Sequence, residues 1–154
     1  MKDIGADDNY NKIQVSFLKA FSYKKYTILG SAVFGTYIGN SIPFYDTFTL
    51  GGFLALSGLH QDQLRGQRMC LARLVTYWNA SQSLLGKFYL GGSLETGNVW
   101  QKHEDIKFSD LRLAGSVFIG YDTPFGPFYL GFGHADGGYN ALYLYLGRTF
   151  GLNF

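Results

Sequence analysis

The sequence predicts an all-β fold of antiparallel strands, and three observations lead to it. Glycine accounts for 21 of the 154 residues, about twice its usual share of roughly 7%. Aromatic residues make up 18% of the chain and charged residues only 16%, whereas the surface of a helical bundle needs many more Glu and Lys. Apolar and polar residues also alternate with a period of two through most of the chain, as they do in strands.

Four strands are expected in the first half of the chain, at residues 13–21, 26–38, 44–53 and 66–78. In the first strand Ile13, Val15 and Phe17 alternate with polar residues, and a Lys-Lys turn leads into the second. The third strand is weaker, because it follows Pro43 and runs into a pair of glycines. An irregular stretch at residues 54–64 separates it from the fourth strand, where the alternation resumes.

Four more strands are expected at residues 87–96, 111–121, 128–132 and 142–154, which gives an even total. A polar loop around His103 separates the fifth from the sixth, and a tight turn at Pro124 separates the sixth from the seventh. The eighth strand places Leu142, Leu144 and Leu146 on one face.

The two faces of these strands differ in a way that predicts a membrane protein. One face is Leu, Phe, Ile and Val almost without interruption. The other carries Gly, Ser, Tyr, Ala and Gln with a few single charges such as Arg73, Glu95 and Arg112. A soluble barrel needs one well-charged face, whereas a lipid-facing apolar band over a moderately polar lumen has this pattern. No apolar run is long enough for a transmembrane helix, so the chain would cross a membrane as strands.

Two segments carry a resemblance to a known family. The first, Phe-Thr-Leu-Gly-Gly-Phe-Leu-Ala-Leu-Ser-Gly-Leu, contains Gly51, Gly52, Ser57 and Gly58. It resembles the inward-folded loop of the outer-membrane assembly and translocation barrels, which are also called the bacterial surface antigen family. The second segment, which begins Leu-Glu-Thr-Gly, contains Glu95 and Gly97 and is similar to the acidic-x-Gly strand motif of that family.

Within this superfamily the chain looks most like the C-terminal barrel of patatin-like phospholipases of Gram-negative bacteria, the type V-d autotransporters. The same loop and the ending Ala-Leu-Tyr-Leu-Tyr-Leu-Gly-Arg carry this resemblance. It implies that residues 1–154 form an outer-membrane barrel domain, the C-terminal half of a sixteen-stranded ring, with the phospholipase domain upstream. It also implies contact with membrane lipid and lipopolysaccharide, insertion by the outer-membrane assembly machinery, and a role in anchoring or exporting the enzyme domain.

The chain departs from the family at one position of the loop motif. Ser57 stands where the family has an arginine, so the family's ion pair with the acidic strand residue cannot form at Glu95. A hydroxyl donor, Arg65 or Arg73 could serve in its place. Strand phase puts Arg73 and Arg112 on the same side as Glu95, which makes them candidates for a structural pair in the lumen.

Half a barrel leaves two open edges, which cannot stand unpaired in hydrocarbon. Either the eight strands close on themselves or two copies pair as a homodimer. Self-closure is the preferred expectation, because eight strands can fill their own interior with side chains.

The sequence also supports two alternatives and several exclusions. A soluble, lipocalin-like ligand-binding barrel fits the length, and a small outer-membrane acyl-transfer enzyme could use the polar cluster at His103. The single cysteine, Cys70, excludes an intrachain disulfide, and the isolated His60 and His134 do not form a metal motif. The basic residues are scattered, so no nucleic-acid partner is expected. We expect no catalysis and no cofactor in this segment.

Overall fold

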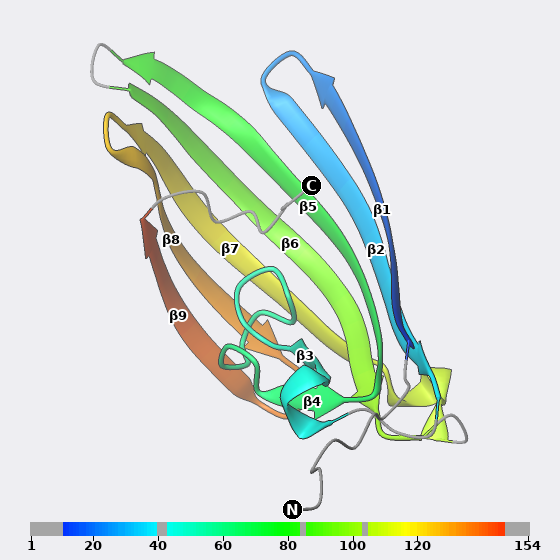
Figure 1. Cartoon of the computed structure of the whole chain (residues 1–154). Coiled ribbons are helices and arrows are strands. Elements are labelled where there is room, and N and C mark those ends of the chain that lie inside the picture. The colour runs from blue at the N-terminus through cyan, green and yellow to red at the C-terminus, as the bar shows by residue number, and fades with distance from the viewer. Residues whose placement is uncertain (1–10, 40–42, 84–85, 103–104, 147–154) are drawn as a thin grey trace, which may run out of the picture.

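The computed structural model describes residues 11–39, 43–83, 86–102 and 105–146. Its main feature is one seven-stranded antiparallel sheet (Figure 1). The strands of this sheet are β1 (Asn11–Tyr23), β2 (Tyr26–Ile38), β5 (Arg68–Ser83), β6 (Gly86–Trp100), β7 (Arg112–Thr123), β8 (Gly126–Ala135) and β9 (Tyr139–Leu146). They lie side by side in chain order, from β1 at one edge to β9 at the other.

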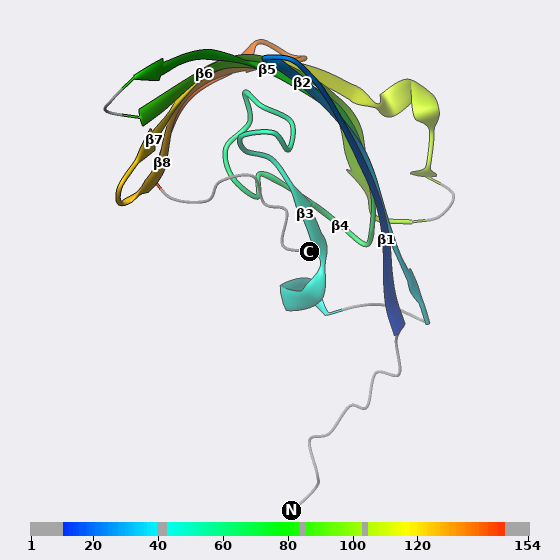
Figure 2. The same cartoon turned by 90° about the horizontal axis from the view of Figure 1, so that it is seen from above.

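The segment between β2 and β5 leaves this sheet. It contains a 3₁₀ turn, η1 (Phe44–Asp46), and two short strands, β3 (Phe48–Leu50) and β4 (Leu64–Gly66), which pair with each other in a separate ribbon. We call residues 48–66 the inner loop. Figure 2 shows that the large sheet is curved like an arch and that the inner loop lies on its concave side.

Two-residue turns join the strands at one end of the sheet. Tyr23 pairs with Tyr26 across the first turn, where Lys24 has a positive φ of 55°. A similar turn lies between β7 and β8, where Gly126 has a φ of 119°. A positive φ at a turn residue, as at Lys24, or at the glycine that follows the turn, as at Gly126, is typical of short hairpin connections. At the other end, η3 (Phe108–Asp110) lies in the connection between β6 and β7. Within the described ranges, no helix is long and apolar enough to span a membrane.

The two faces of the arch have opposite surroundings. Side chains on the concave face pack against the inner loop and form two buried clusters with it. The convex face is apolar and uncovered, with Leu142 at 72% and Leu144 at 67% exposure. Large exposed apolar side chains on this face include Phe17, Phe21, Leu74, Leu90, Leu94, Leu113, Val117, Ile119, Leu130 and Phe132. The predicted alternation of an apolar and a mixed face therefore appears in every strand of the sheet.

The all-β, antiparallel fold is confirmed, and so is the position of seven predicted strands. β2 has the predicted bounds, whereas β5 continues to Ser83 past a register shift between Asn79 and Ser81. The eighth predicted strand corresponds to β9, and its residues 147–154 lie outside the described part of the chain.

The prediction of a third sheet strand at residues 44–53 is wrong. This segment forms η1 and the three-residue β3, whose partner β4 begins in the stretch expected to be irregular. The physical reason lies in the glycine pair, because Gly51 and Gly52 adopt φ values of 128° and 108°, outside the range of an extended strand. The chain therefore turns into the concavity instead of continuing the sheet.

The expectation of eight strands that close on themselves is also wrong. The described residues contain nine strands, of which seven form the large sheet, and β1 and β9 lie at its two ends without pairing to each other. The diversion of residues 48–66 into the inner loop removes one predicted strand from the ring. Within the described residues, the sheet therefore has two open edges.

Candidate functional site: the inner loop and the Glu95 carboxylate

The inner loop is held in place first by burial of its apolar side chains. Leu56 and Leu59 are fully buried, and Leu50 and Leu54 are 3% exposed. Their packing partners come from the concave face of the sheet, namely Leu71, Ala114, Ala135, Val75 and Phe118. Burial of a leucine side chain stabilises by roughly 1.5–3 kcal/mol, so this loop is an integral part of the fold rather than a surface connection.

A buried carboxylate lies directly beneath the tip of the loop. Glu95, on β6, is 1% exposed, and one of its oxygens accepts hydrogen bonds from the backbone N–H groups of Leu56 and Ser57, both at 2.7 Å. The other oxygen accepts the Ser57 hydroxyl at 2.8 Å and also the hydroxyl of Ser93. Four donors thus converge on one carboxylate. Because a buried charge is tolerated only when it is well hydrogen-bonded, these donors explain how Glu95 remains in the core.

The backbone of the loop tip is shaped to present these donors. Leu54 and Leu56 have positive φ values of 60° and 74°, which residues with a Cβ adopt rarely. Successive amides in such a conformation point into a concavity that suits an anion. The Ser57 Oγ also accepts the Leu54 N–H at 3.0 Å, so the hydroxyl braces the strained turn and donates to Glu95 at the same time. Strain of this kind costs about 1–3 kcal/mol per residue and persists because the surroundings fix it.

Tyr143 holds the next part of the loop. Its hydroxyl, reaching across from β9, accepts the Gly58 N–H at 2.8 Å and donates to the Leu59 carbonyl at 2.6 Å. Gly58 fits here for two reasons, since its φ is 109° and a Cβ would lie 2.5 Å from the backbone N of Ala135. Gly133 on β8 is equally tight, because its Cβ would lie 2.6 Å from the Gly58 N. The loop and the sheet are therefore in backbone contact at this point.

Arg73 binds the loop beside Glu95 rather than Glu95 itself. The two residues are cross-strand neighbours on β5 and β6. The Arg73 Nη1 donates to the Leu54 carbonyl and its Nε donates to the Ser31 hydroxyl, both at 2.8 Å. The Arg73 guanidinium thus donates to a loop carbonyl, while the neighbouring Glu95 carboxylate accepts from loop amides. Among the described residues, Arg73 and Glu95 form no ion pair within 4.0 Å.

The other candidate partners of Glu95 lie elsewhere. Arg112 lies opposite Gly97 in the register of β6 and β7, two residues along from Glu95. Arg65 on β4 lies over the ring of Phe44, 5.5 Å from its centroid. The sequence offered a hydroxyl, Arg65 and Arg73 as donors to Glu95. In the structure the donor among these is a hydroxyl, that of Ser57.

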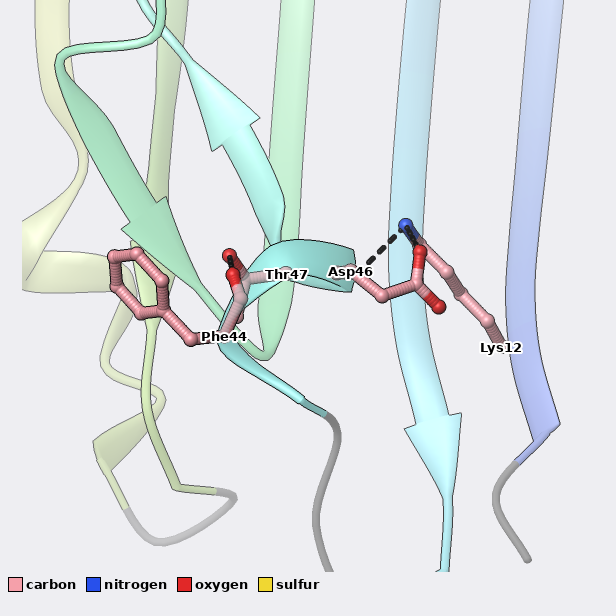
Figure 3. A network of polar contacts seen from close by, with 4 residues as sticks. All are labelled: Lys12, Phe44, Asp46 and Thr47. Atoms are coloured by element: carbon pink, nitrogen blue, oxygen red, sulfur yellow. Dashed lines mark hydrogen bonds and ion pairs between the residues drawn. The ribbon is translucent and has the colours of Figure 1, made fainter. Parts of the chain in front are cut away.

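The root of the inner loop is tied to the first strand. Lys12 of β1 donates to the Asp46 carbonyl at 2.9 Å and forms an ion pair with its carboxylate at 3.1 Å (Figure 3). Lys12 also lies 4.5 Å from the centroid of the Phe48 ring. The Thr47 hydroxyl closes the adjoining turn by donating to the Phe44 carbonyl at 2.9 Å, as the same view shows. These exposed contacts are individually weak, but they fix the direction in which the chain enters the concavity.

Of the other residues considered from the sequence, those that the structure describes have structural surroundings. Gly97 is required by space, because its Cβ would lie 2.4 Å from the Cys70 carbonyl oxygen. Cys70 is a partly buried free thiol. His134 contacts Asn140 through its ring at 2.7 Å, and His103 lies outside the described residues. In the described ranges, no group of three or more His, Cys, Asp or Glu side chains is placed to hold a metal ion.

Sequence reasoning missed three contributors to this site. The amides of Leu56 and Ser57 depend on loop geometry, which has no residue-type signal. Ser93 could have been found, because it precedes Glu95 by two residues and so shares its face. Tyr143 also shares the concave face, but nothing in the sequence indicates that its hydroxyl reaches the loop.

The contacts of this arrangement hold the inner loop against the sheet. A carboxylate that already accepts four hydrogen bonds is in a poor state to act as a general base. The Ser57 hydroxyl donates to that carboxylate, and no histidine is among its hydrogen-bond partners in the described residues. The geometry therefore defines a locked inner loop inside a curved antiparallel sheet.

No protein-family model matches the chain, and no curated protein matches it. Among solved structures, the chain is similar to the crystal structure of BamA from Haemophilus ducreyi lacking POTRA domains 1–3. The TM-score is 0.73 at 14% sequence identity, and the match covers 92% of this chain and 35% of that one. This likeness shows the fold: the chain shares the architecture of about a third of that protein. It agrees with the expected resemblance to the outer-membrane assembly barrels at the level of fold, and the patatin-type assignment stays a prediction.

Proposed function

We propose that this chain is part of an outer-membrane β-barrel that anchors an upstream patatin-like phospholipase domain and assists its export. In this proposal the convex face contacts lipid and lipopolysaccharide, and the outer-membrane assembly machinery inserts the strands. The locked inner loop partly fills the lumen. The residues that lock the inner loop around Glu95 have structural roles, and the segment itself carries out no catalysis.

The exposed convex face is the observation that carries the proposal. Its side chains are large and apolar on every strand of the sheet, with Leu144 at 67% and Val117 at 63% exposure. A water-soluble protein rarely leaves so continuous an apolar surface uncovered. Lipid is the environment in which such a surface is stable, and an antiparallel sheet with a mixed inner face is the form that strands take there.

The similarity to BamA adds support of a second kind. The chain spans about 35% of the length of that protein, and we infer that its seven-stranded sheet is part of a larger ring. The open edges at β1 and β9 are consistent with this, because an unpaired edge is costly in hydrocarbon. Further strands from outside this sheet would complete the ring.

The exposed face also argues against a soluble, lipocalin-like barrel. Such a protein would bury its apolar face inside and present charged residues outside. In this structure the inner face carries Glu95, Arg73 and several serines and tyrosines, whereas the outer face carries the aliphatic side chains. The polarity is that of a protein whose outside faces lipid.

The experiment that tests the proposal is folding in detergent against folding in plain buffer. We expect a compact, β-rich particle in maltoside micelles and aggregation without them, measured by circular dichroism and gel filtration. Light scattering with the detergent contribution subtracted then gives the number of chains in the particle. A monodisperse, folded monomer in buffer would overturn the membrane assignment.

The anchoring role needs a separate experiment. An enzyme domain of the patatin type fused upstream of the chain should appear in the outer-membrane fraction of a Gram-negative host, and deletion of the barrel segment should release it. If the fused domain fractionates identically with and without the segment, the anchoring proposal fails even where the detergent experiment succeeds.

A further inference from the structure

Among the described residues, the walls of a small cavity on the concave face are aromatic. It has a volume of about 120 Å³ and lies among Tyr77 of β5, Tyr89 of β6, Phe118 of β7 and Tyr129 of β8. Tyr77 meets Tyr89 edge to face with ring centroids 5.8 Å apart, and Phe118 meets Tyr129 in the same way at 6.4 Å. Rings from four neighbouring strands thus enclose one space.

Glycines on the two central strands make room for these rings. A Cβ on Gly91 would lie 2.4 Å from the Phe118 ring, and a Cβ on Gly120 would lie 2.7 Å from the Tyr129 ring. Both glycines therefore leave bare backbone beneath the aromatic walls. Phe118 and Tyr129 are almost fully buried, so the walls are held firmly.

A carboxylate stands at the side of this cavity. The Tyr89 hydroxyl donates to the Asp122 Oδ2 at 2.5 Å, which orients the phenol and pushes electron density into its ring. The nearest basic residue on the same face of β6 is Lys87, and its side chain is exposed rather than packed into the cavity. Aromatic faces combined with one negative charge attract a cation.

Two simpler explanations account for less of this arrangement. Aromatic girdles of membrane barrels lie on the lipid face, whereas these four rings point to the concave side, opposite the convex band. Aromatic packing over glycines explains the contacts, but packing alone would close the space between the rings. Between the rings of the described residues a space of about 120 Å³ remains, which is of a size for a small organic cation.

We propose that this aromatic cage binds a quaternary ammonium group of the kind that choline carries. A trimethylated nitrogen suits the site because it places its diffuse positive charge against ring faces and needs no hydrogen-bond acceptor. The free cation is favoured over a phosphocholine headgroup, since a phosphate would bring negative charge toward Asp122. The assignment concerns the concave face of this sheet and is independent of which domain the barrel anchors.

A titration of the detergent-folded chain with methyl-labelled choline tests the proposal. Maltoside micelles are suitable because maltoside detergents contain no trimethylammonium group. Ring currents should move the choline methyl resonance upfield and saturably. The uncharged isostere 3,3-dimethylbutanol should bind at least about tenfold more weakly, because it has the shape without the charge. Phosphocholine should also bind more weakly than choline.

Two variants and a control locate the site. Tyr129→Leu removes one wall and should weaken choline binding by about tenfold. Asp122→Asn keeps all four rings and should weaken choline binding roughly threefold or more. This variant tests the site even if Tyr129→Leu does not fold. Tyr37→Leu changes a tyrosine of β2 that does not line the cavity, and its affinity should equal that of the unchanged protein.

Three results would overturn the proposal. The first is the absence of a saturable methyl shift in the folded, unchanged chain. The second is equal binding of choline and its uncharged isostere, which would indicate a merely apolar cavity. The third is unchanged affinity in both Tyr129→Leu and Asp122→Asn.

Discussion

The Glu95 carboxylate lies 2.7 Å from the backbone N of Ser57, although 38 residues separate the two in the chain. This contact joins the tip of the inner loop to the centre of the sheet. It also shows how a loop can be locked without an ion pair, because two backbone amides and two hydroxyls together satisfy the buried charge. Four predictions follow from this relationship and from the faces of the sheet.

Glu95→Gln should release the tip of the inner loop. The amide group of glutamine would face donors with its own N–H₂, so at least one buried donor would be left without an acceptor, at about 1–3 kcal/mol. We expect faster proteolysis within residues 48–66 of the detergent-folded chain. Asp62→Asn is the matched control, because Asp62 is an exposed carboxylate of the same loop that accepts only the Thr49 hydroxyl among the contacts described here. Equal cleavage of the two variants would contradict the role assigned to Glu95.

Ser57→Ala should also weaken the attachment of the inner loop to the sheet. The substitution removes the hydroxyl that donates to Glu95 and accepts from Leu54, but both backbone amides still reach the carboxylate. Loss of the hydrogen bond to the charged group predicts a decrease in unfolding free energy of about 1.5–3 kcal/mol, to which the loss of the Leu54 N–H acceptor adds. Urea titration in detergent measures this decrease. Ser22→Ala, which removes a partly buried hydroxyl pair with Thr27, serves as the comparison and should cost less.

Gly133→Ala should push the inner loop away from the sheet. A Cβ at this position would lie 2.6 Å from both the Gly58 N and the Ser57 Cβ, closer than atoms in proteins approach. We expect faster hydrogen exchange at the Gly58 amide and a lower midpoint of unfolding. Gly30→Ala is the control, since a Cβ there has no atom within 4 Å. The packing argument fails if both alanine variants behave alike.

Leu144→Arg should block folding into detergent. Leu144 is exposed on the convex face, and an arginine near the middle of a lipid-facing band costs roughly 2–4 kcal/mol. Asn140→Arg, at the beginning of the same strand and beside His134, should fold normally. Both are measured by the yield of β-rich particle after dilution from urea. Normal yield for Leu144→Arg would show that the convex face does not contact lipid.

Much of the fold could be predicted because it depends on local patterns. The bounds of β2 follow from its alternation and from the Lys24-Lys25 turn, and the apolar face of β9 follows from Leu142, Leu144 and Leu146. The path of residues 44–53 could not be predicted in the same way. Their sequence alternates well enough for a strand, but the positive φ of Gly51 and Gly52 and the burial of Leu56 and Leu59 turn the chain inward. Burial against distant strands is a tertiary effect that local alternation does not report.

The candidate site could be predicted only in part, for a related reason. The motif residues Ser57, Gly58 and Glu95 do meet in space, and strand phase places Arg73 beside Glu95 correctly. The partners of the carboxylate are backbone amides, however, and every residue type carries one. The expected Arg73–Glu95 pair is replaced by a contact from Arg73 to a loop carbonyl, because the loop brings both its donors and its acceptors to the two charges.

The odd number of strands in the sheet restricts how any ring can be completed. Successive neighbours are antiparallel, so β1 and β9, the first and last of seven, run in the same direction. Direct closure, or two copies related by rotation about the ring axis, would therefore create parallel seams. Two copies related by a perpendicular axis would meet antiparallel, but their long-loop ends would then face opposite sides of a membrane. Consider a ring in which all neighbouring strands are antiparallel and all the long-loop ends face the same side of the membrane. Such a ring needs an odd number of additional strands from outside these seven.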